Sequence, residues 1–231
     1  NSAACRPVVI GGRTGVGKTR LLADCRSQID LEALANHRGS AFGNPPQPQP
    51  SPIDFENALS IALLKQVAAG NRPFLVEDES RNIGRRHIPG GIFERLQHAP
   101  LVLLEASDEE RIAITLQEYV HDALAEFSAL YGTDDGFAAW AGYLRDSMQR
   151  IRRRLGGDRH TQVNRMLDDA IARHAASGDV TGHADWIAFL LHEYYDGMYE
   201  YQLANKADRI VFRGDRRAVL DYLRSDHDID V

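Results

Sequence analysis

The sequence predicts an α/β fold, in which a parallel β-sheet lies between helices and carries a helical subdomain. Three observations lead to this prediction. Short apolar runs without polar alternation are separated by helical segments, which is typical of parallel strands buried on both faces. A glycine-rich loop follows the first apolar run, and a long stretch of helical periodicity precedes the last one.

The first elements follow from local patterns. Residues 6–11 predict a buried strand that enters the glycine loop, and residues 19–29 predict a helix after it. Residues 44–52 are rich in proline and predict an extended, exposed connector. A helix is expected over residues 54–69, with Asp54 as its N-cap, because apolar residues recur there on one face.

The later elements repeat the alternation of strands and helices. Residues 73–78 and 101–105 predict two more strands, and residues 209–212 predict the last one. Acidic residues at 108–110 open a helical stretch that continues to about Asn205. The expected division is an α/β core of residues 1–115 and 206–231 and a helical subdomain of residues 116–205.

The composition is that of an ordinary globular protein: 231 residues, 43% hydrophobic and 26% charged. We expect no membrane span, because no apolar run approaches the roughly 18 residues that a membrane helix needs, and no secretory signal opens the sequence. The two cysteines, Cys5 and Cys25, lack the spacing of a metal or redox motif. A reducing, cytoplasmic location is therefore expected.

Positive charge is concentrated in one segment, although the net charge of the chain is −6. Residues 145–165 contain seven arginines and two aspartates, a local charge of +5. Such a stripe can bind phosphate even on an acidic protein, because close charges are screened least. A solvated helix face is the alternative. The arginines predicted to contact a nucleic-acid backbone are Arg150, Arg152, Arg153, Arg154 and Arg159.

Residues 12–19 match the phosphate-loop pattern G-x-x-x-x-G-K-[ST] at every fixed position, between a predicted strand and a predicted helix. Glycines let several backbone N–H groups converge on one anion, and the helix N-terminus adds its dipole. Lys18 can reach terminal phosphate oxygens, and the Thr19 hydroxyl can bind Mg²⁺. The predicted fold is therefore P-loop NTPase-like. The predicted phosphate-binding residues are Gly12, Thr14, Gly15, Val16, Gly17, Lys18 and Thr19.

Acidic residues end the second predicted strand, where P-loop proteins often hold Mg²⁺. Glu77 and Asp78 are therefore predicted metal ligands together with Thr19, with a solvated strand end as the alternative. The polar segment 36–40 predicts a substrate loop, or a surface turn held by its glycine. The candidate substrate-loop residues are His37, Arg38, Gly39 and Ser40, with Arg81 and Arg85 as possible phosphate partners. No catalytic residue is assigned, and His37 is the candidate proton carrier because the reference pKa of histidine is near neutrality.

The glycine loop is followed by an ordered set of segments: Asp30–Gly43 with its Asn-His-Arg-Gly-Ser, then Phe55-Glu56-Asn57, then Val76–Gly84 with its Glu-Asp-Glu-Ser-Arg. Together they resemble tRNA 2-selenouridine synthase, densely over Val8–Pro100 and more by order and helical content beyond that. The phosphate loop alone would not indicate a family, whereas these segments in combination do.

The resemblance implies a transferase that geranylates 2-thiouridine at the wobble position of tRNA with geranyl diphosphate and then replaces sulfur by selenium with selenophosphate. It also implies an N-terminal rhodanese-like domain with a catalytic cysteine, which we expect to be missing here. Neither Cys5 nor Cys25 has that cysteine's context, so this chain alone is not expected to complete selenation. The phosphate loop is expected to bind geranyl diphosphate with Mg²⁺, and the arginine stripe to contact tRNA.

Two other functions share the same motifs. A nucleotide-dependent small-molecule kinase would use the phosphate loop for ATP and the helical segment as a lid. A non-catalytic tRNA-binding module would use the loop only as a structural anion clamp. The family-specific segments favour the synthase.

Overall fold

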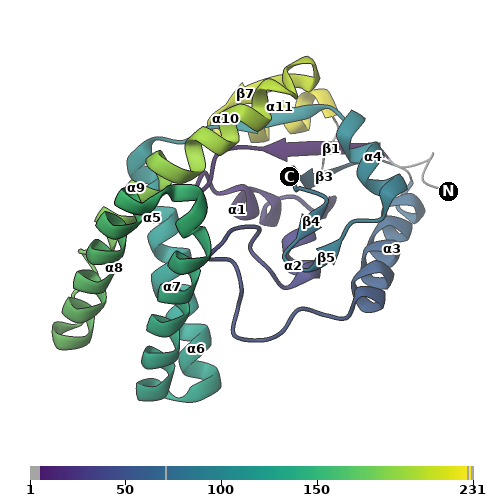
Figure 1. Ribbon diagram of the computed structural model, residues 1–231. Helices are drawn as coiled ribbons and strands as arrows, with labels where there is room; N and C mark the ends of the chain where they lie inside the picture. The colour runs from purple at the N-terminus through teal and green to yellow at the C-terminus, as the bar shows by residue number, and fades with distance from the viewer. Residues whose placement is uncertain (1–5, 71, 228, 230–231) are drawn as a thin grey trace.

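The computed structural model describes residues 6–70, 72–227 and 229, and Cys5 lies outside this part (Figure 1). A five-stranded parallel sheet in the order β2-β3-β1-β6-β7 forms its centre. The strands are β1 (Arg6–Gly11), β2 (Gln28–Ile29), β3 (Pro73–Glu77), β6 (Leu101–Leu104) and β7 (Ile210–Gly214). This sheet, with helices on both faces, confirms the predicted P-loop NTPase-like α/β class.

The three central strands are apolar on both faces, as their uninterrupted sequence runs predicted. In the register of β1 and β3, Val8 lies beside Leu75 and Val9 beside Val76. One face of the sheet packs against the cluster that contains Phe55, and the other packs against the cluster that contains Leu21. Strands of a parallel sheet are apolar on both faces because helices cover the sheet on both sides.

Five helices accompany the sheet: α1 (Lys18–Ala23), α2 (Leu31–Ala35), α3 (Pro52–Ala68), α4 (Gly90–His98) and α11 (Arg216–His227). The predicted helix over 19–29 was too long, because α1 ends at Ala23 and residues 28–29 form β2, where Ile29 is buried beside β3. The N-cap of α3 is Ser51 rather than Asp54, since the Ser51 hydroxyl accepts a hydrogen bond from the Asp54 N–H at 3.2 Å. Proline at the first helical position suits this start.

The remaining helices lead away from the sheet on the side opposite α3 and α4, and the last of them return to the sheet beside β7 (Figure 1). They are α5 (Asp108–Leu116), η2 (Gln117–Asp122), α6 (Ala123–Tyr131), α7 (Thr133–Leu155), α8 (Gly157–Ser177), α9 (His183–Leu190), η3 (Leu191–Asp196), α10 (Gly197–Ala204) and η4 (Ala207–Arg209). A capping box of Ser107 and Glu110 starts α5. Both η2 and η3 are π-helical turns within longer helices.

A separate apolar cluster, built around the fully buried Trp140 and Trp186, holds these helices together. Phe42 belongs to the same cluster although it lies in the loop after α2, and its ring stacks on Tyr119 with centroids 5.5 Å apart. The loop after α2 therefore bridges the sheet and the helical part. The division of the chain at residues 116 and 205 remains a prediction.

A buried histidine is part of this helical core. His183 is fully buried, and its Nδ1 accepts a hydrogen bond from Trp186 Nε1 at 3.0 Å. The neutral ring therefore carries its proton on Nε2, which lies 3.3 Å from His174 Nδ1. Burial, and then the nearby His174, lower the pKa of His183 to about 4. Protonation would place an N–H against the Trp186 donor.

We expect the contribution of His183 to the free energy of unfolding to fall by about 2–3 kcal/mol as the pH drops from about 6.5 to 4. The unfolded chain, with an ordinary histidine pKa, binds this proton more readily over that range, so stability is fully present above pH 6.5. Urea unfolding at each pH would measure it. The variant His183→Gln should lose this part of the pH dependence, whereas replacement of the exposed His98 should not. If the free energy of unfolding changes with pH in the same way for wild type and His183→Gln, the prediction is wrong.

Candidate functional site

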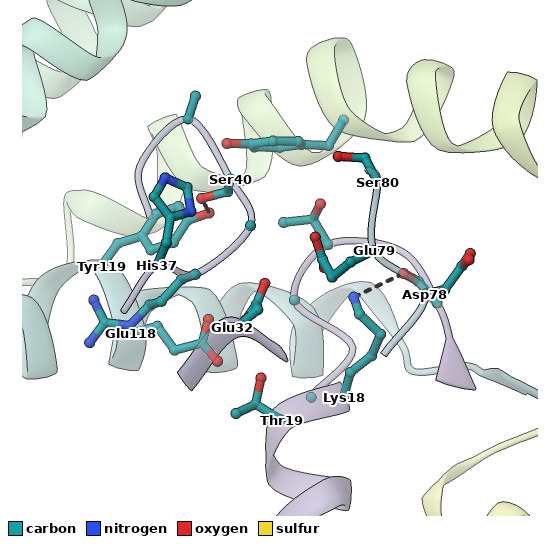
Figure 2. A pocket seen from close by; sticks show the side chains of 18 of the residues that line it. Lys18, Thr19, Glu32, His37, Ser40, Asp78, Glu79, Ser80, Glu118 and Tyr119 are labelled. Carbon is teal, nitrogen blue, oxygen red and sulfur yellow. Dashed lines mark hydrogen bonds between the residues drawn. The ribbon is translucent and has the colours of Figure 1, made fainter. Parts of the chain in front are cut away.

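A cavity of about 760 Å³ lies where β1 and β3 end at the carboxyl edge of the sheet. The glycine loop forms its floor, and the loop after α2 and the acids after β3 line its sides. In Figure 2, Lys18, Glu32 and Glu79 point toward its middle from three separate segments. Residues of η2, η3 and α10 form part of the wall opposite the glycine loop. The topology thus brings together five segments that are far apart in the sequence.

The glycine loop has the shape that its sequence pattern predicts. Gly15 and Gly17 have φ values of +81° and +85°, a backbone region that favours glycine. The Lys18 ammonium donates a hydrogen bond to the Gly12 carbonyl oxygen at 3.2 Å. Six predicted phosphate-binding residues line the cavity: Gly12, Thr14, Gly15, Gly17, Lys18 and Thr19. The seventh, Val16, turns its side chain into the apolar core.

An arginine that the sequence analysis did not single out supports this loop from below. Arg111, on α5, is 1% exposed, and its Nε donates a hydrogen bond to the Thr14 carbonyl oxygen at 3.0 Å. Its Nη1 donates to Asp108 and Asp196, at 3.0 Å in each case. In the sequence, the one indication of this role was that the arginine adjoins the apolar positions of a predicted helix.

The structure contradicts part of the predicted metal site. Glu77 still belongs to β3, and successive strand residues point to opposite faces, so its side chain turns away from the cavity. Its carboxylate accepts hydrogen bonds from the Leu31 and Glu32 N–H groups at 3.0 and 3.3 Å, and burial raises its pKa well above the ordinary value. Glu77 is therefore not a metal ligand but a buried support for the start of α2.

The other predicted acid, Asp78, does line the cavity but is already paired. The Lys206 ammonium donates to both carboxylate oxygens of Asp78, at 2.8 and 2.7 Å. Thr19 lines the cavity close to Lys18 (Figure 2). Among the residues described, no group of three or more histidine, cysteine or acidic side chains is arranged to hold a metal. A Mg²⁺ ion here would depend on phosphate oxygens for much of its coordination.

Two glutamates beside Lys18 form a carboxyl pair. Their carboxyl oxygens converge beside Gly39, where a Cβ atom would lie 2.3 Å from Glu32 Oε1 and 3.1 Å from Glu79 Oε1. Burial, and then the neighbouring Glu79, raise the pKa of Glu32 to about 8, while Lys18 acts in the opposite direction. The raised pKa favours the protonated form of Glu32 near neutral pH, which reduces the repulsion of a bound phosphate by this pair.

The predicted substrate loop does reach the cavity, where His37, Arg38, Gly39 and Ser40 all line it. A Cβ atom on Gly39 would lie 2.3 Å from Glu32 Oε1, so the loop backbone lies directly against the carboxyl pair. Burial, followed by the charge of Arg150, lowers the pKa of His37, which favours a neutral ring. Arg38 is paired with Glu126, and Ser40 accepts a hydrogen bond from the Tyr119 hydroxyl at 2.8 Å.

Arg81 and Arg85 were wrongly grouped with the substrate loop. Both are exposed and lie outside the cavity lining, because the chain turns away at the hairpin of β4 (Asn82–Ile83) and β5 (Arg86–His87). Gln49 connects that hairpin to the proline-rich segment by accepting from the Arg85 N–H at 2.7 Å and donating to the Ile83 carbonyl at 3.0 Å. The proline-rich segment is therefore anchored rather than a free connector.

The two π-helical turns supply the wall across from the glycine loop. From η2 come Glu118, Tyr119 and Asp122, and from η3 and α10 come Tyr194, Tyr195, Met198, Tyr199 and Gln202. A π-helical turn inserts an extra residue into a helix and so redirects its side chains, often at functional sites. The wall thus combines aromatic rings and a thioether with two acids and an amide, and it faces the glycine loop. Helical periodicity in the sequence did not identify these residues as the lining of a cavity.

Comparison with known proteins places this cavity in a family. Residues 5–229 match the family model of the tRNA 2-selenouridine synthase AAA domain. The chain belongs to this family. It is 50% identical over 222 residues to tRNA 2-selenouridine synthase of Bordetella bronchiseptica, 51% over 217 residues to that of Cupriavidus necator, and 44% over 226 residues to that of Aeromonas salmonicida.

These alignments cover 96%, 94% and 98% of the chain but only 60%, 59% and 61% of the three relatives. The chain thus spans about 60% of the length of the tRNA 2-selenouridine synthases that it matches. Within the described residues, no helix is both long and apolar enough to cross a membrane.

In this selenouridine synthase domain, the predicted nucleic-acid arginines lie in different surroundings. Arg154 lines the cavity, and its neighbours Arg152 and Arg153 are exposed at the end of α7. Arg150 donates to the Ala41 carbonyl oxygen at 3.1 Å, which fixes the substrate loop. Arg159 is paired with Glu193 at 3.0 Å. Their contact with tRNA remains a prediction.

Proposed function

We propose that this chain is the diphosphate-binding part of a tRNA-modifying transferase, which geranylates 2-thiouridine at the wobble position and then exchanges sulfur for selenium. The observation that carries the proposal is the composition of one cavity: an anion-binding glycine loop faces a wall of tyrosines and a methionine. A ligand with a diphosphate at one end and an apolar chain at the other matches these two surfaces.

The glycine loop would stabilise the diphosphate as it leaves. Backbone N–H groups of the loop and the Lys18 ammonium line the cavity. They would face the negative charge that grows on the diphosphate as the tRNA sulfur bonds to the geranyl carbon and the allylic C–O bond breaks. A Mg²⁺ ion, when bound, would neutralise part of that charge, with the Thr19 hydroxyl as the protein ligand that fits best. The apolar chain would lie along Tyr194, Met198 and Tyr199, which line the opposite wall.

The acceptor would be a tRNA anticodon loop. Arg154 lies at the cavity, and Arg152 and Arg153 continue the positive charge along the exposed end of α7. Backbone phosphates are the natural partners of such arginines, and an unstacked base can enter a cavity that a duplex cannot. Selenation with selenophosphate would additionally require the rhodanese-like domain, in keeping with relatives that extend beyond this chain.

The test is a thermal-shift titration of the chain with Mg²⁺ and geranyl diphosphate, pyrophosphate, ATP or GTP, for wild type and Lys18→Ala. A ligand at 100 times its Kd stabilises by about 2.7 kcal/mol, or about 5–10 °C for a chain of this size. We expect geranyl diphosphate to give the largest shift, and Lys18→Ala to remove it. Stabilisation by ATP or GTP alone would instead support the nucleotide-dependent kinase, and unchanged tRNA modification by the full-length Lys18→Ala enzyme would support the non-catalytic module.

A further inference from the structure

Arg111 holds the middle of the glycine loop from the side opposite the cavity. Its guanidinium is fixed from three directions, by the Thr14 carbonyl oxygen and the carboxylates of Asp108 and Asp196. The side chain is 1% exposed and is not among the cavity-lining residues. A buried, planar guanidinium group that is hydrogen-bonded on all these sides has little freedom to move.

The contact with Thr14 determines which way the next amide points. The C=O of Thr14 and the N–H of Gly15 belong to one trans peptide plane, so they point in opposite directions. Because the carbonyl oxygen is held by the buried Arg111, the Gly15 N–H is turned to the other side of the loop. On that side Gly15 lines the cavity.

A reversed peptide would harm anion binding in two ways. It would remove one donor from the loop and aim a carbonyl oxygen at the phosphate. The loop also lies directly against α5, since a Cβ atom on Gly15 would be 2.7 Å from the Arg111 carbonyl oxygen and 2.5 Å from Thr115 Oγ1. Arg111 thus contacts the loop through both its backbone and its side chain.

We propose that Arg111 is a positioning residue of the phosphate site, which keeps the Gly15 N–H directed at the bound phosphate. The proposal rests on the proposed function in taking the glycine loop as the site of the diphosphate. Its effect is geometric, because two aspartates neutralise the guanidinium charge. Asp196 ends η3, between the wall residues Tyr195 and Met198, so the same guanidinium also sets the loop in register with that wall.

The variant Arg111→Lys separates geometry from charge. Lysine keeps a positive charge opposite Asp196 but cannot bind Thr14 and both aspartates with one ammonium group. In calorimetric titrations with Mg²⁺ and pyrophosphate, we expect its Kd to rise about tenfold, which corresponds to 1.4 kcal/mol. The matched control is Arg173→Lys, the same change at an exposed ion pair with Asp179, which should bind as wild type does. A wild-type Kd for Arg111→Lys would overturn the proposal.

A measurement on the wild type covers the case in which Arg111→Lys does not fold. In ¹⁵N–¹H spectra, pyrophosphate should shift the amide resonance of Gly15 strongly, together with those of Gly17 and Lys18. If Gly17 and Lys18 shift while Gly15 does not, the Gly15 N–H does not face the phosphate and the positioning role is wrong. If no resonance shifts and no heat is released, the chain does not bind diphosphate, and the proposed function itself fails.

Discussion

The replacement of Gly15 by alanine is expected to abolish diphosphate binding and to lower the free energy of unfolding by about 2–5 kcal/mol. Gly15 has a φ of +81°, which strains any residue with a side chain. The added methyl group would also lie 2.7 Å from the Arg111 carbonyl oxygen, a backbone atom that cannot rotate away. The loop must therefore change shape, and its N–H groups no longer converge.

Gly142→Ala is the matched control for this prediction. Gly142 lies within α7, and among the described residues nothing beyond the adjoining backbone of this helix comes within 4 Å of the position its Cβ would take. Alanine should stabilise that helix by about 0.5–1 kcal/mol. Urea unfolding and pyrophosphate titration of both variants would measure the difference. Retention of wild-type affinity by Gly15→Ala would show that the loop does not bind the ligand in this conformation.

The second large effect is expected from Asp196→Ala, which should lower the free energy of unfolding by about 3–5 kcal/mol. Asp196 is the buried partner of Arg111, and its removal leaves a buried guanidinium with only Asp108, which is 53% exposed, as counter-charge. Arg13 of the glycine loop also loses its contact with Asp196 at 3.7 Å. We therefore expect weaker pyrophosphate binding in addition to lower stability.

An exposed ion pair provides the comparison for Asp196. Arg145 and Asp168 are 2.7 Å apart, with side chains 47% and 43% exposed. Asp168→Ala should cost less than about 1 kcal/mol, because water solvates the arginine that remains. Urea unfolding of the two variants in the same buffer would test the contrast. Equal losses for Asp168→Ala and Asp196→Ala would mean that the Arg111 pair is not as desolvated as the structure describes.

Side chains that act through distant contacts were outside the reach of sequence reasoning. Arg111 lies 85 positions from Asp196 and 97 from Thr14, and no periodicity connects residues so far apart. Glu77 and Asp78 are adjacent acids, and in the sequence both were equally plausible as metal ligands. Only the tertiary structure showed that Glu77 turns into the core and that Asp78 pairs with Lys206.

The sequence by itself determined the α/β class, the glycine loop and the polar segment 36–40, because glycine spacing and apolar runs act over a few neighbouring residues. The tertiary structure decided what surrounds the loop: the Glu32–Glu79 pair, the aromatic wall and the buried Arg111. Those features depend on which strands become neighbours and on where two π-helical turns redirect side chains. Burial energy summed over the whole fold sets that arrangement, and no local pattern encodes it.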